Sequence, residues 1–155
     1  MSLREPDETY LDSLRALLGP QGWRAGDDAE PYLTEPRGRL RGHAALVVRP
    51  GSAEEVAEVV RRCAAAQVAV VPYGGGTGLV GGQVMTEGPS PVVLSVERLN
   101  RIRRAEADED ALIVEAGVTL AEARAAAERI DRLFPLSLAS QGSCRIGGLL
   151  ATNPG

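Results

Sequence analysis

The chain has 155 residues, 44% of them hydrophobic and 25% charged, so it can form one domain with a buried core and falls outside the disordered class. Its formal net charge is −4, and acidic and basic residues are mixed along the whole length, which argues against nucleic acid as a partner. All 17 basic residues are Arg, and a Walker-type phosphate loop needs a Lys, so that class of nucleotide site is excluded.

The remaining composition bears on compartment and chemistry. Cys63 and Cys144 lie far apart and form neither a CxxC pair nor a disulfide framework, which suits a reducing compartment. No apolar run approaches the roughly 18 residues that cross a membrane, and residues 1–12 are too polar for a signal peptide. The prediction is a cytoplasmic protein without a membrane span.

His43 is the only histidine, so we expect no metal site and no Ser–His–Asp triad within the chain. His43 itself is predicted to lie at a strand edge.

The first part of the chain predicts a helix, a lead-in and a strand–helix–strand unit. Residues 6–18 place leucines on one helical face, and residues 21–42 lack periodicity and are predicted to be irregular. Residues 44–48 form a short apolar strand, and residues 68–71 a β-branched one. Between them, a capping-box spacing precedes apolar residues at helical intervals, which predicts a parallel β-α-β unit. The residues of this helix pattern are Ser52, Glu55, Val56, Val59, Val60, Cys63 and Ala64.

The second part predicts a strand, a hairpin and one more helix. Residues 92–96 read as a buried strand, and residues 102–106 and 111–116 as a hairpin with an acidic turn between them. Thr119 and Glu122 repeat the capping-box spacing and open a helix through residue 130. Residues 133–138 are predicted to be extended, and residues 142–155 to be a glycine-rich stretch with a short apolar centre. Because no closing helix or strand is predicted there, we expect a fragment of a longer protein.

Residues 74–82, which read GGGTGLVGG, contain six glycines in nine positions. Each glycine loses more backbone freedom on folding than other residues, so the run needs a compensating interaction. Backbone N–H groups without a neighbouring Cβ can converge on one anion, and charge-assisted hydrogen bonds contribute about 1.5–3 kcal/mol each. The run therefore predicts a phosphate-binding loop directly after a strand, and a tight turn without ligand is the alternative.

The same run contains a GxGxxG pattern at residues 76–81, which is typical of Rossmann dinucleotide-binding domains. In such domains the pattern opens a helix whose N-terminus meets the pyrophosphate. Residues 82–91 contain two Gly and two Pro residues, which break helices, and are not expected to form that helix. Glu97 lies about 20 residues on, where Rossmann domains place an acid, but one acid at that spacing is expected by chance.

Two motifs in order resemble a known family. Residues 72–82 resemble the pyrophosphate loop of the FAD-linked oxidases of the vanillyl-alcohol-oxidase/PCMH type. Residues 135–138, 142–148 and 151–153 resemble a second motif of the branch that contains the D-lactate, glycolate-oxidase-subunit and D-2-hydroxyglutarate dehydrogenases. The RPGSAEEV opening at residues 49–56 and the RLNRI segment at residues 98–102 are also typical of this branch. Leu149 stands where the family more often has Asn.

The resemblance implies an α+β fold: a PCMH-type FAD-binding domain of two α/β subdomains, the second of them truncated. This domain would cover residues 37–155, and residues 1–36 would form an N-terminal helix and lead-in. It implies that the amides of residues 74–78 bind the pyrophosphate of FAD, that the Thr77 hydroxyl adds a contact, and that the second motif lines the flavin and ribityl side. We expect non-covalent FAD, because residues 74–82 contain neither His nor Cys, and a packing role for Cys144. The implied cofactor contacts are Pro72, Gly74, Gly75, Gly76, Thr77, Gly78, Leu79, Gly81, Gly82, Pro135, Gly142, Ser143, Cys144, Ile146, Gly147, Gly148, Thr152 and Asn153.

The activity implied by the resemblance is oxidation of a D-2-hydroxy acid, of the D-lactate, glycolate or D-2-hydroxyglutarate type, to the 2-oxo acid by hydride transfer to FAD. Family members carry their catalytic and metal-binding residues in a substrate domain that this chain lacks, so no catalytic or metal-binding residue is predicted here. The electron acceptor stays open, and a homodimer is compatible with the sequence. Two alternatives remain: a MurB-like reductase that takes hydride from NADPH, and a non-catalytic FAD-binding subunit of an oxidase complex.

Overall fold

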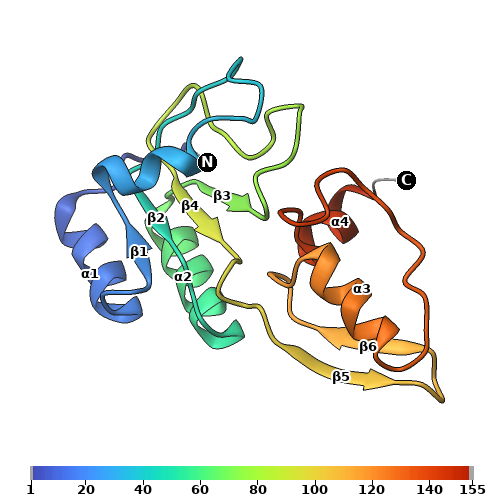
Figure 1. Ribbon diagram of the computed structural model, residues 1–155. Coiled ribbons are helices and arrows are strands. Elements are labelled where there is room, and N and C mark those ends of the chain that lie inside the picture. The colour runs from blue at the N-terminus through green and yellow to red at the C-terminus, as the bar shows by residue number, and fades with distance from the viewer. Residues whose placement is uncertain (1, 154–155) are drawn as a thin grey trace.

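A computed structural model describes residues 2–153, which form two lobes side by side (Figure 1). The first lobe, residues 2–97, contains a four-stranded sheet in the order β1, β2, β4, β3, and the second lobe, residues 102–153, contains a two-stranded hairpin under two helices. The predicted α+β class with two subdomains is confirmed by this arrangement. No helix among residues 2–153 is long and apolar enough to cross a membrane.

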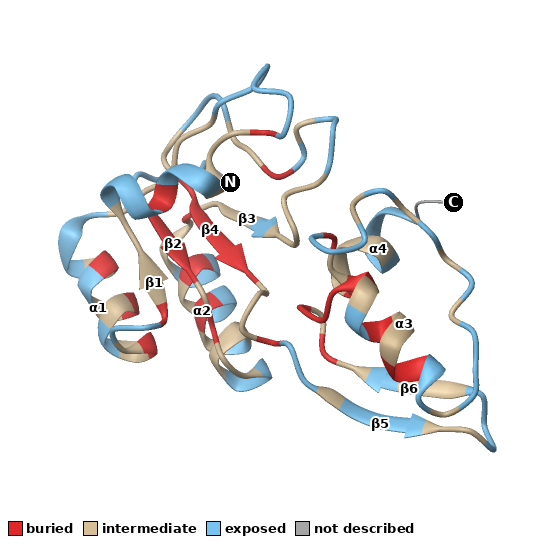
Figure 2. Ribbon diagram, in the orientation of Figure 1, coloured by how far each residue is buried: buried red, intermediate tan, exposed pale blue. Residues whose placement is uncertain are grey.

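The sheet of the first lobe is mostly parallel. Strands β2 (Leu46–Val48), β4 (Val92–Ser95) and β3 (Val70–Tyr73) run parallel, and β1 (Trp23–Arg24) joins β2 in antiparallel pairing. Strands β2 and β4 are buried on both faces, which explains their unbroken apolar sequence (Figure 2). The predicted β-α-β unit exists, but β4 lies between its two strands, so β2 and β3 are not neighbours.

Different elements cover the two faces of this sheet. Helices α1 (Glu8–Leu18) and α2 (Ala53–Ala66) pack their leucine, valine and cysteine side chains against Leu46, Val48 and Val92 on one face. On the other face, the short 3₁₀ helix η1 (Gly26–Tyr32) and the side chains of Tyr32 and Tyr73 pack against Val47 and Val93. This second, thinner cover matters for function, because it places two tyrosines at the carboxyl end of β3.

Of the two predicted capping boxes, the one at α3 is complete, and the one at α2 has only the hydrogen bond to the Ser52 side chain. At α3 (Leu120–Glu128) Thr119 and Glu122 satisfy each other's backbone amides, a complete capping box. At α2 the Ser52 hydroxyl accepts from the Glu55 amide at 3.2 Å, but the Glu55 carboxylate accepts from the Gly51 amide at 2.6 Å instead of the Ser52 amide. Both helices begin within one residue of the predicted start.

In the second lobe, β5 (Ile102–Glu106) and β6 (Ala111–Val114) form the predicted hairpin, and α3 lies against it. A further helix, α4 (Ile146–Thr152), follows the second glycine-rich motif. Val118, Ala123 and Ile146 form the small core between these elements.

Several predictions were wrong in detail. Residues 21–42 are not wholly irregular, since they contain β1 and η1 and an isolated bridge between Thr34 and Arg41. Residues 142–155 were expected to lack a helix, whereas α4 occupies their apolar centre. Val60, expected on the inner face of α2, is 46% exposed. Strand β3 lies two residues later than predicted, so it runs directly into the glycine loop.

Candidate cofactor-binding site

Strand β3 ends at the boundary between the two lobes, and the glycine run starts there (Figure 1). Residues 74–91 then connect β3 to its neighbour β4 without any helix. The GxGxxG pattern at residues 76–81 therefore lacks the helix that a Rossmann site requires, as predicted. Its glycines serve a loop, and Gly76 and Gly81 have φ angles of +69° and +79°, which favour glycine.

The backbone amides of this loop are free. Within residues 2–153, none of the amides from Gly74 to Gln83 donates a hydrogen bond to another described residue. The loop holds its shape in other ways, because the Gln83 side chain donates to the Gly78 carbonyl at 2.7 Å and the Val84 amide donates to the Gly81 carbonyl at 3.1 Å. Successive free amides in a turn conformation form a concave site for an anion.

The two glycine motifs meet in space. A Cβ added to Gly75 would overlap the carbonyl oxygen of Ser143, and one added to Gly74 would lie 3.6 Å from the Cα of Gly148. Gly75 therefore has no room for a side chain, whereas at Gly74 an added Cβ would make an ordinary van der Waals contact with the second motif. The lobes are in contact at the point where the first motif leaves β3 and the second enters α4.

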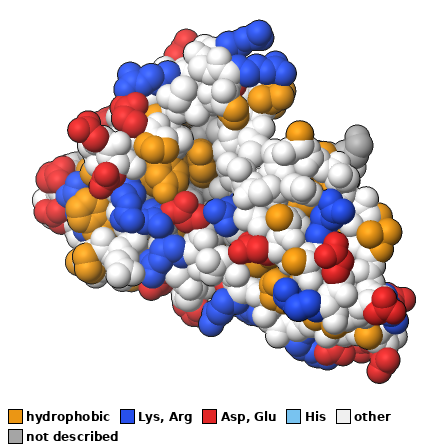
Figure 3. All heavy atoms as spheres, in the orientation of Figure 1, with side chains coloured by type: hydrophobic (Ala, Val, Ile, Leu, Met, Phe, Trp, Pro, Cys, Tyr) orange, Lys and Arg blue, Asp and Glu red, His pale blue; other side chains and the backbone are white. Residues whose placement is uncertain are grey.

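A cavity of about 270 Å³ opens at this contact. It contains residues from both motifs together with side chains that the sequence did not single out as cofactor contacts. In Figure 3 the upper surface between the lobes is largely white, the colour of backbone and uncharged polar side chains. The residues lining the cavity are Pro31, Tyr32, Tyr73, Gly74, Gly75, Glu97, Gly142, Ser143 and Arg145.

One wall of the cavity is a hydrogen-bonded group of polar side chains. The Tyr32 hydroxyl donates to Glu97 at 2.8 Å, and the same carboxylate is ion-paired with Arg49. The Tyr32 and Tyr73 rings meet edge to face, with centroids 5.1 Å apart. Burial, and then the bond to Glu97, raise the pKa of Tyr32 to about 12, and burial also raises the pKa of Tyr73. Both hydroxyls therefore keep their protons throughout the neutral range, and Tyr73 donates its proton to the Pro31 carbonyl at 3.3 Å.

The opposite wall carries a positive charge. Arg145 directly precedes α4, and its Nη1 donates to the Gly117 carbonyl at 2.6 Å. Neither Tyr32 nor Arg145 was predicted as a site residue. Tyr32 lies in a segment without periodicity, so no sequence pattern pointed to it. Arg145 could have been found from the sequence, because it is the only charged residue after Arg132.

The predicted cofactor contacts fall into three groups. Gly74, Gly75, Gly142 and Ser143 lie together in the cavity, and Pro72, Gly76 and Thr77 adjoin it along the chain. Gly78, Leu79, Gly81 and Gly82 follow in the outer part of the loop, where the neighbouring Val80 is 92% exposed. The remaining residues divide between packing and surface positions: Cys144, Ile146 and Gly147 pack inside the second lobe, Gly148 faces open space, and Pro135, Thr152 and Asn153 lie exposed.

The packing group includes residues whose side chains point away from any ligand. Cys144 is 2% exposed and Ile146 is 8% exposed, and Ile146 belongs to the small core of the second lobe. Gly147 packs against Ala116, where an added Cβ would lie 2.8 Å from that residue's Cβ. Cys144 thus packs as expected, and any contact of these three with a cofactor would involve the backbone.

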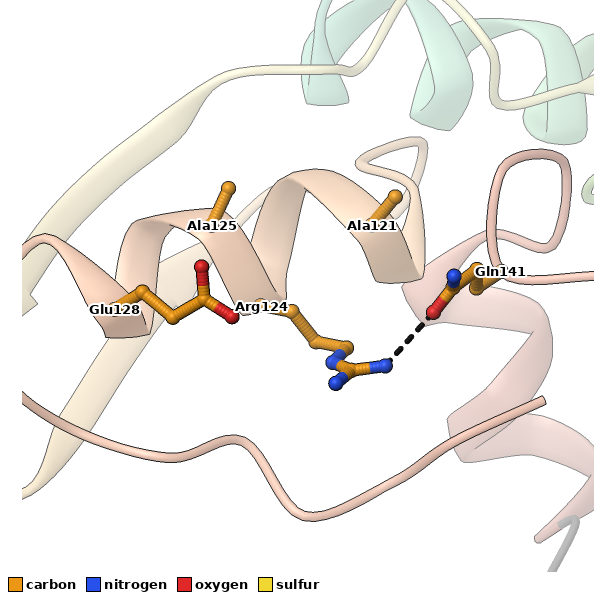
Figure 4. A pocket seen from close by; sticks show the side chains of 5 residues that line it. All are labelled: Ala121, Arg124, Ala125, Glu128 and Gln141. Atoms are coloured by element: carbon orange, nitrogen blue, oxygen red, sulfur yellow. Dashed lines mark hydrogen bonds between the residues drawn. The ribbon is translucent and has the colours of Figure 1, made fainter.

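A second cavity, of about 240 Å³, lies on the outer side of α3 (Figure 4). Ala121, Ala125 and Glu128 line it, and Arg124 donates to the Gln141 side chain at 2.8 Å across it. It contains none of the predicted site residues, and its two charged residues, Arg124 and Glu128, lie on one face of α3. The cavity between the lobes is therefore the candidate site.

The comparisons with known proteins identify the family. A family profile described as "FAD binding domain" matches residues 44–155. The chain belongs to this FAD-binding domain family. FAD is accordingly the cofactor of this domain, and the glycine motifs at both sides of the cavity belong to the matched region.

Relatives and solved structures agree with this assignment. The chain is 43% identical over 128 residues to a D-2-hydroxyglutarate dehydrogenase of Xanthomonas citri pv. viticola, covering 83% of this chain and 27% of that protein. It is 37% identical over 116 residues to the mitochondrial D-2-hydroxyglutarate dehydrogenase of Rattus norvegicus, covering 75% of this chain and 21% of that protein. The chain thus spans about a quarter of the length of these relatives.

The fold is shared with a solved structure. An alkyldihydroxyacetonephosphate synthase superposes on 98% of this chain and 30% of its own, with a TM-score of 0.83 and 21% sequence identity. At that identity the likeness establishes the fold, and it confirms the predicted PCMH-type architecture of two adjacent lobes.

Proposed function

We propose that this chain is the FAD-binding part of a flavin-dependent dehydrogenase that oxidises a D-2-hydroxy acid to the 2-oxo acid. The names of the relatives from Xanthomonas citri and rat support this substrate class. The observation that carries the proposal is the row of free amides from Gly74 to Gln83 beside the cavity between the lobes. When bound, FAD would supply the hydride acceptor for the substrate's α-carbon.

The residues present fit a dinucleotide. The amides of residues 74–78 would hold the diphosphate, and Thr77 would add its hydroxyl. Gly142, Ser143, Gly148, Thr152 and Asn153 would lie along the flavin and ribityl part, where Gly148 leaves open space for a flat ring. Pro72, Leu79, Gly81, Gly82 and Pro135 would shape the loop ends and the outer contacts of the cofactor.

The protein's part in the reaction would be to orient the flavin and exclude water from one side of it. The Tyr32 and Tyr73 hydroxyls stay protonated, and the bonds that they donate to Glu97 and to the Pro31 carbonyl hold both rings beside the cavity. Within residues 2–153 no group of three or more His, Cys, Asp or Glu side chains could hold a metal ion. The family resemblance implies that the catalytic base and any metal ligands belong to a separate substrate domain.

Substituting Gly78 tests the loop assignment. A Cβ at Gly78 would approach only the flexible Gln83 side chain, at 3.1 Å, so Gly78→Val should fold. We expect the variant to lose FAD, because a branched side chain blocks the approach of a phosphate to the neighbouring amides. Thr86→Val is the matched control, an exposed position later in the same connection, and it should retain FAD. A Gly78→Val protein that still purifies yellow would contradict the loop assignment.

Two further measurements test the attachment and the activity. Acid precipitation should release all flavin into solution, because residues 74–82 contain no His or Cys and Cys144 is buried. In the full-length protein, D-2-hydroxyglutarate or D-lactate should bleach the flavin absorbance, and bleaching by NADPH alone would favour a reductase. We also propose a cytoplasmic location. The name of the rat relative places that protein in mitochondria, so cell fractionation is needed to check the location of this one.

A further inference from the structure

Arg145 forms no ion pair within residues 2–153, although the Glu122 carboxylate, itself bonded to Thr119, lies close enough to feel its charge. Its Nη1 donates to the Gly117 carbonyl at 2.6 Å, while its Nε is buried and has no hydrogen-bond partner within the described part of the chain. A buried donor on a charged group without a partner is costly, so its presence calls for an explanation.

The surroundings of Arg145 point to an anion as the missing partner. Its side chain lines the same cavity as Gly74 and Gly75, whose amides are also free, and its Cβ lies 3.9 Å from where a Gly74 Cβ would stand. The one carboxylate lining the cavity, that of Glu97, is already bound by Tyr32 and Arg49. The cavity therefore combines a fixed guanidinium and several N–H donors with no free acceptor of matching charge.

We propose that Arg145 binds the diphosphate of FAD together with the amides of Gly74 and Gly75, and that it makes the site selective for a flavin that carries a diphosphate. The proposal rests on the proposed function in taking FAD as the ligand. A guanidinium presents parallel N–H donors that match two phosphate oxygens, and partial burial strengthens the attraction. The hydrogen bond to Gly117 holds the guanidinium in place before the ligand arrives.

The test compares three ligands on flavin-free protein. FAD, ADP and riboflavin are titrated into the wild type, Arg145→Met, Arg145→Lys and the control Arg124→Met. Arg124 is also an arginine of the second lobe, but it faces the other cavity and contacts Gln141 (Figure 4). We expect Arg145→Met to weaken FAD and ADP by a similar factor, about 10- to 100-fold, and to leave riboflavin unchanged. Arg145→Lys should fall between, and Arg124→Met should match the wild type.

Salt dependence gives a second readout. Losing a phosphate contact should make the ADP dissociation constant of Arg145→Met less sensitive to ionic strength than that of the wild type. Thermal unfolding of the flavin-free variants shows whether they fold. If Arg145→Met does not fold, the Lys variant carries the test, and it should bind ADP more weakly than the wild type while binding riboflavin equally well.

The outcomes separate this proposal from the proposed function. Unchanged FAD and ADP binding in a folded Arg145→Met would overturn the role of Arg145 while leaving FAD binding intact. An equal loss for riboflavin would also overturn it, since the arginine would then act on the ring. A wild type that binds neither FAD nor ADP would overturn the proposed function, and this inference with it.

Discussion

The two glycine-rich motifs use glycine for opposite purposes. In the first, at residues 74–82, the backbone amides are free and the glycines keep side chains away from them. In the second, the amides are used internally: Ser143 and Cys144 donate to Ser140, and Gly147 donates to Ala116, each at 2.8 Å. The first motif therefore leaves its donors available, as the proposed role in binding a diphosphate requires, and the second chiefly lets backbone segments pack closely. A glycine-rich sequence alone does not distinguish these two roles.

The largest effect is expected where the two motifs touch. A side chain at Gly75 would overlap the Ser143 carbonyl, which is backbone and has little room to move. We expect Gly75→Val to lower the free energy of unfolding by about 3 kcal/mol or more and to abolish FAD binding. Gly82→Val, where an added Cβ meets open space, is the control for stability. Equal melting temperatures for the two variants would show that the lobes do not meet as described.

The packing role of the second motif is tested at Gly147. An added Cβ would lie 2.8 Å from the Ala116 Cβ and 3.1 Å from its carbonyl oxygen. We expect Gly147→Ala to destabilise the protein by about 1–3 kcal/mol, measured by urea unfolding. FAD affinity should change little once the protein is folded, and a large loss of affinity at unchanged stability would instead assign Gly147 to the ligand site.

The adjacent Gly148 should behave in the reverse way. It lies inside α4 with open space around an added Cβ, so Gly148→Ala should stabilise the flavin-free protein by about 0.5–1 kcal/mol through the better helix propensity of Ala. If the flavin lies against this position, the same variant should bind FAD more weakly. A variant that is more stable and binds FAD as well as the wild type would remove Gly148 from the site.

A smaller effect concerns the support beneath the second motif. Glu115, next to Ala116, has a side chain that is 4% exposed and is bound by Arg101 and Arg103. The hydrogen bond from Arg101 is the main cause that lowers the pKa of Glu115 to about 2, below its ordinary value of 4.5. Because the carboxylate is more acidic in the folded state, its contribution to stability is complete above about pH 4.5 and is lost as the pH falls towards 2.

Glu115→Gln should remove that pH dependence. Between pH 5 and pH 3 the melting temperature of the wild type should fall further than that of the variant, as measured by calorimetry. Asp110→Asn, at an exposed ion pair with Arg132, is the matched control and should follow the wild type. Parallel curves for Glu115→Gln and the wild type would show that this carboxylate is not held by the arginines.

The sequence predicted local structure better than the meeting of distant parts. Capping residues such as Thr119 and apolar spacing in α2 are local signals, and the corresponding helices formed within one or two residues of expectation. The glycine loop was found because its composition is unusual on its own. Strand order was not predictable in the same way, since inserting β4 between β2 and β3 depends on contacts across the whole lobe.

The same limit applies to the site. Gly74, Gly75, Gly142 and Ser143 were predicted as contacts and lie together. Tyr32 reaches the cavity only because η1 covers one face of the sheet, and no periodic pattern announces η1. Helix α4 was missed because two glycines stand in its first turn, and glycine normally weakens a helix by up to about 1 kcal/mol. Here packing of Ile146 into the small core outweighs that cost.

The free amides of the glycine loop can be observed directly. In an NMR titration of isotope-labelled, flavin-free protein with ADP, the amide resonances of residues 74–78 should shift to lower field as they donate to the diphosphate. Those of Ser143, Cys144 and Gly147, which are already bonded within the protein, should move much less. Large shifts at the second motif with none between residues 74 and 78 would contradict the account.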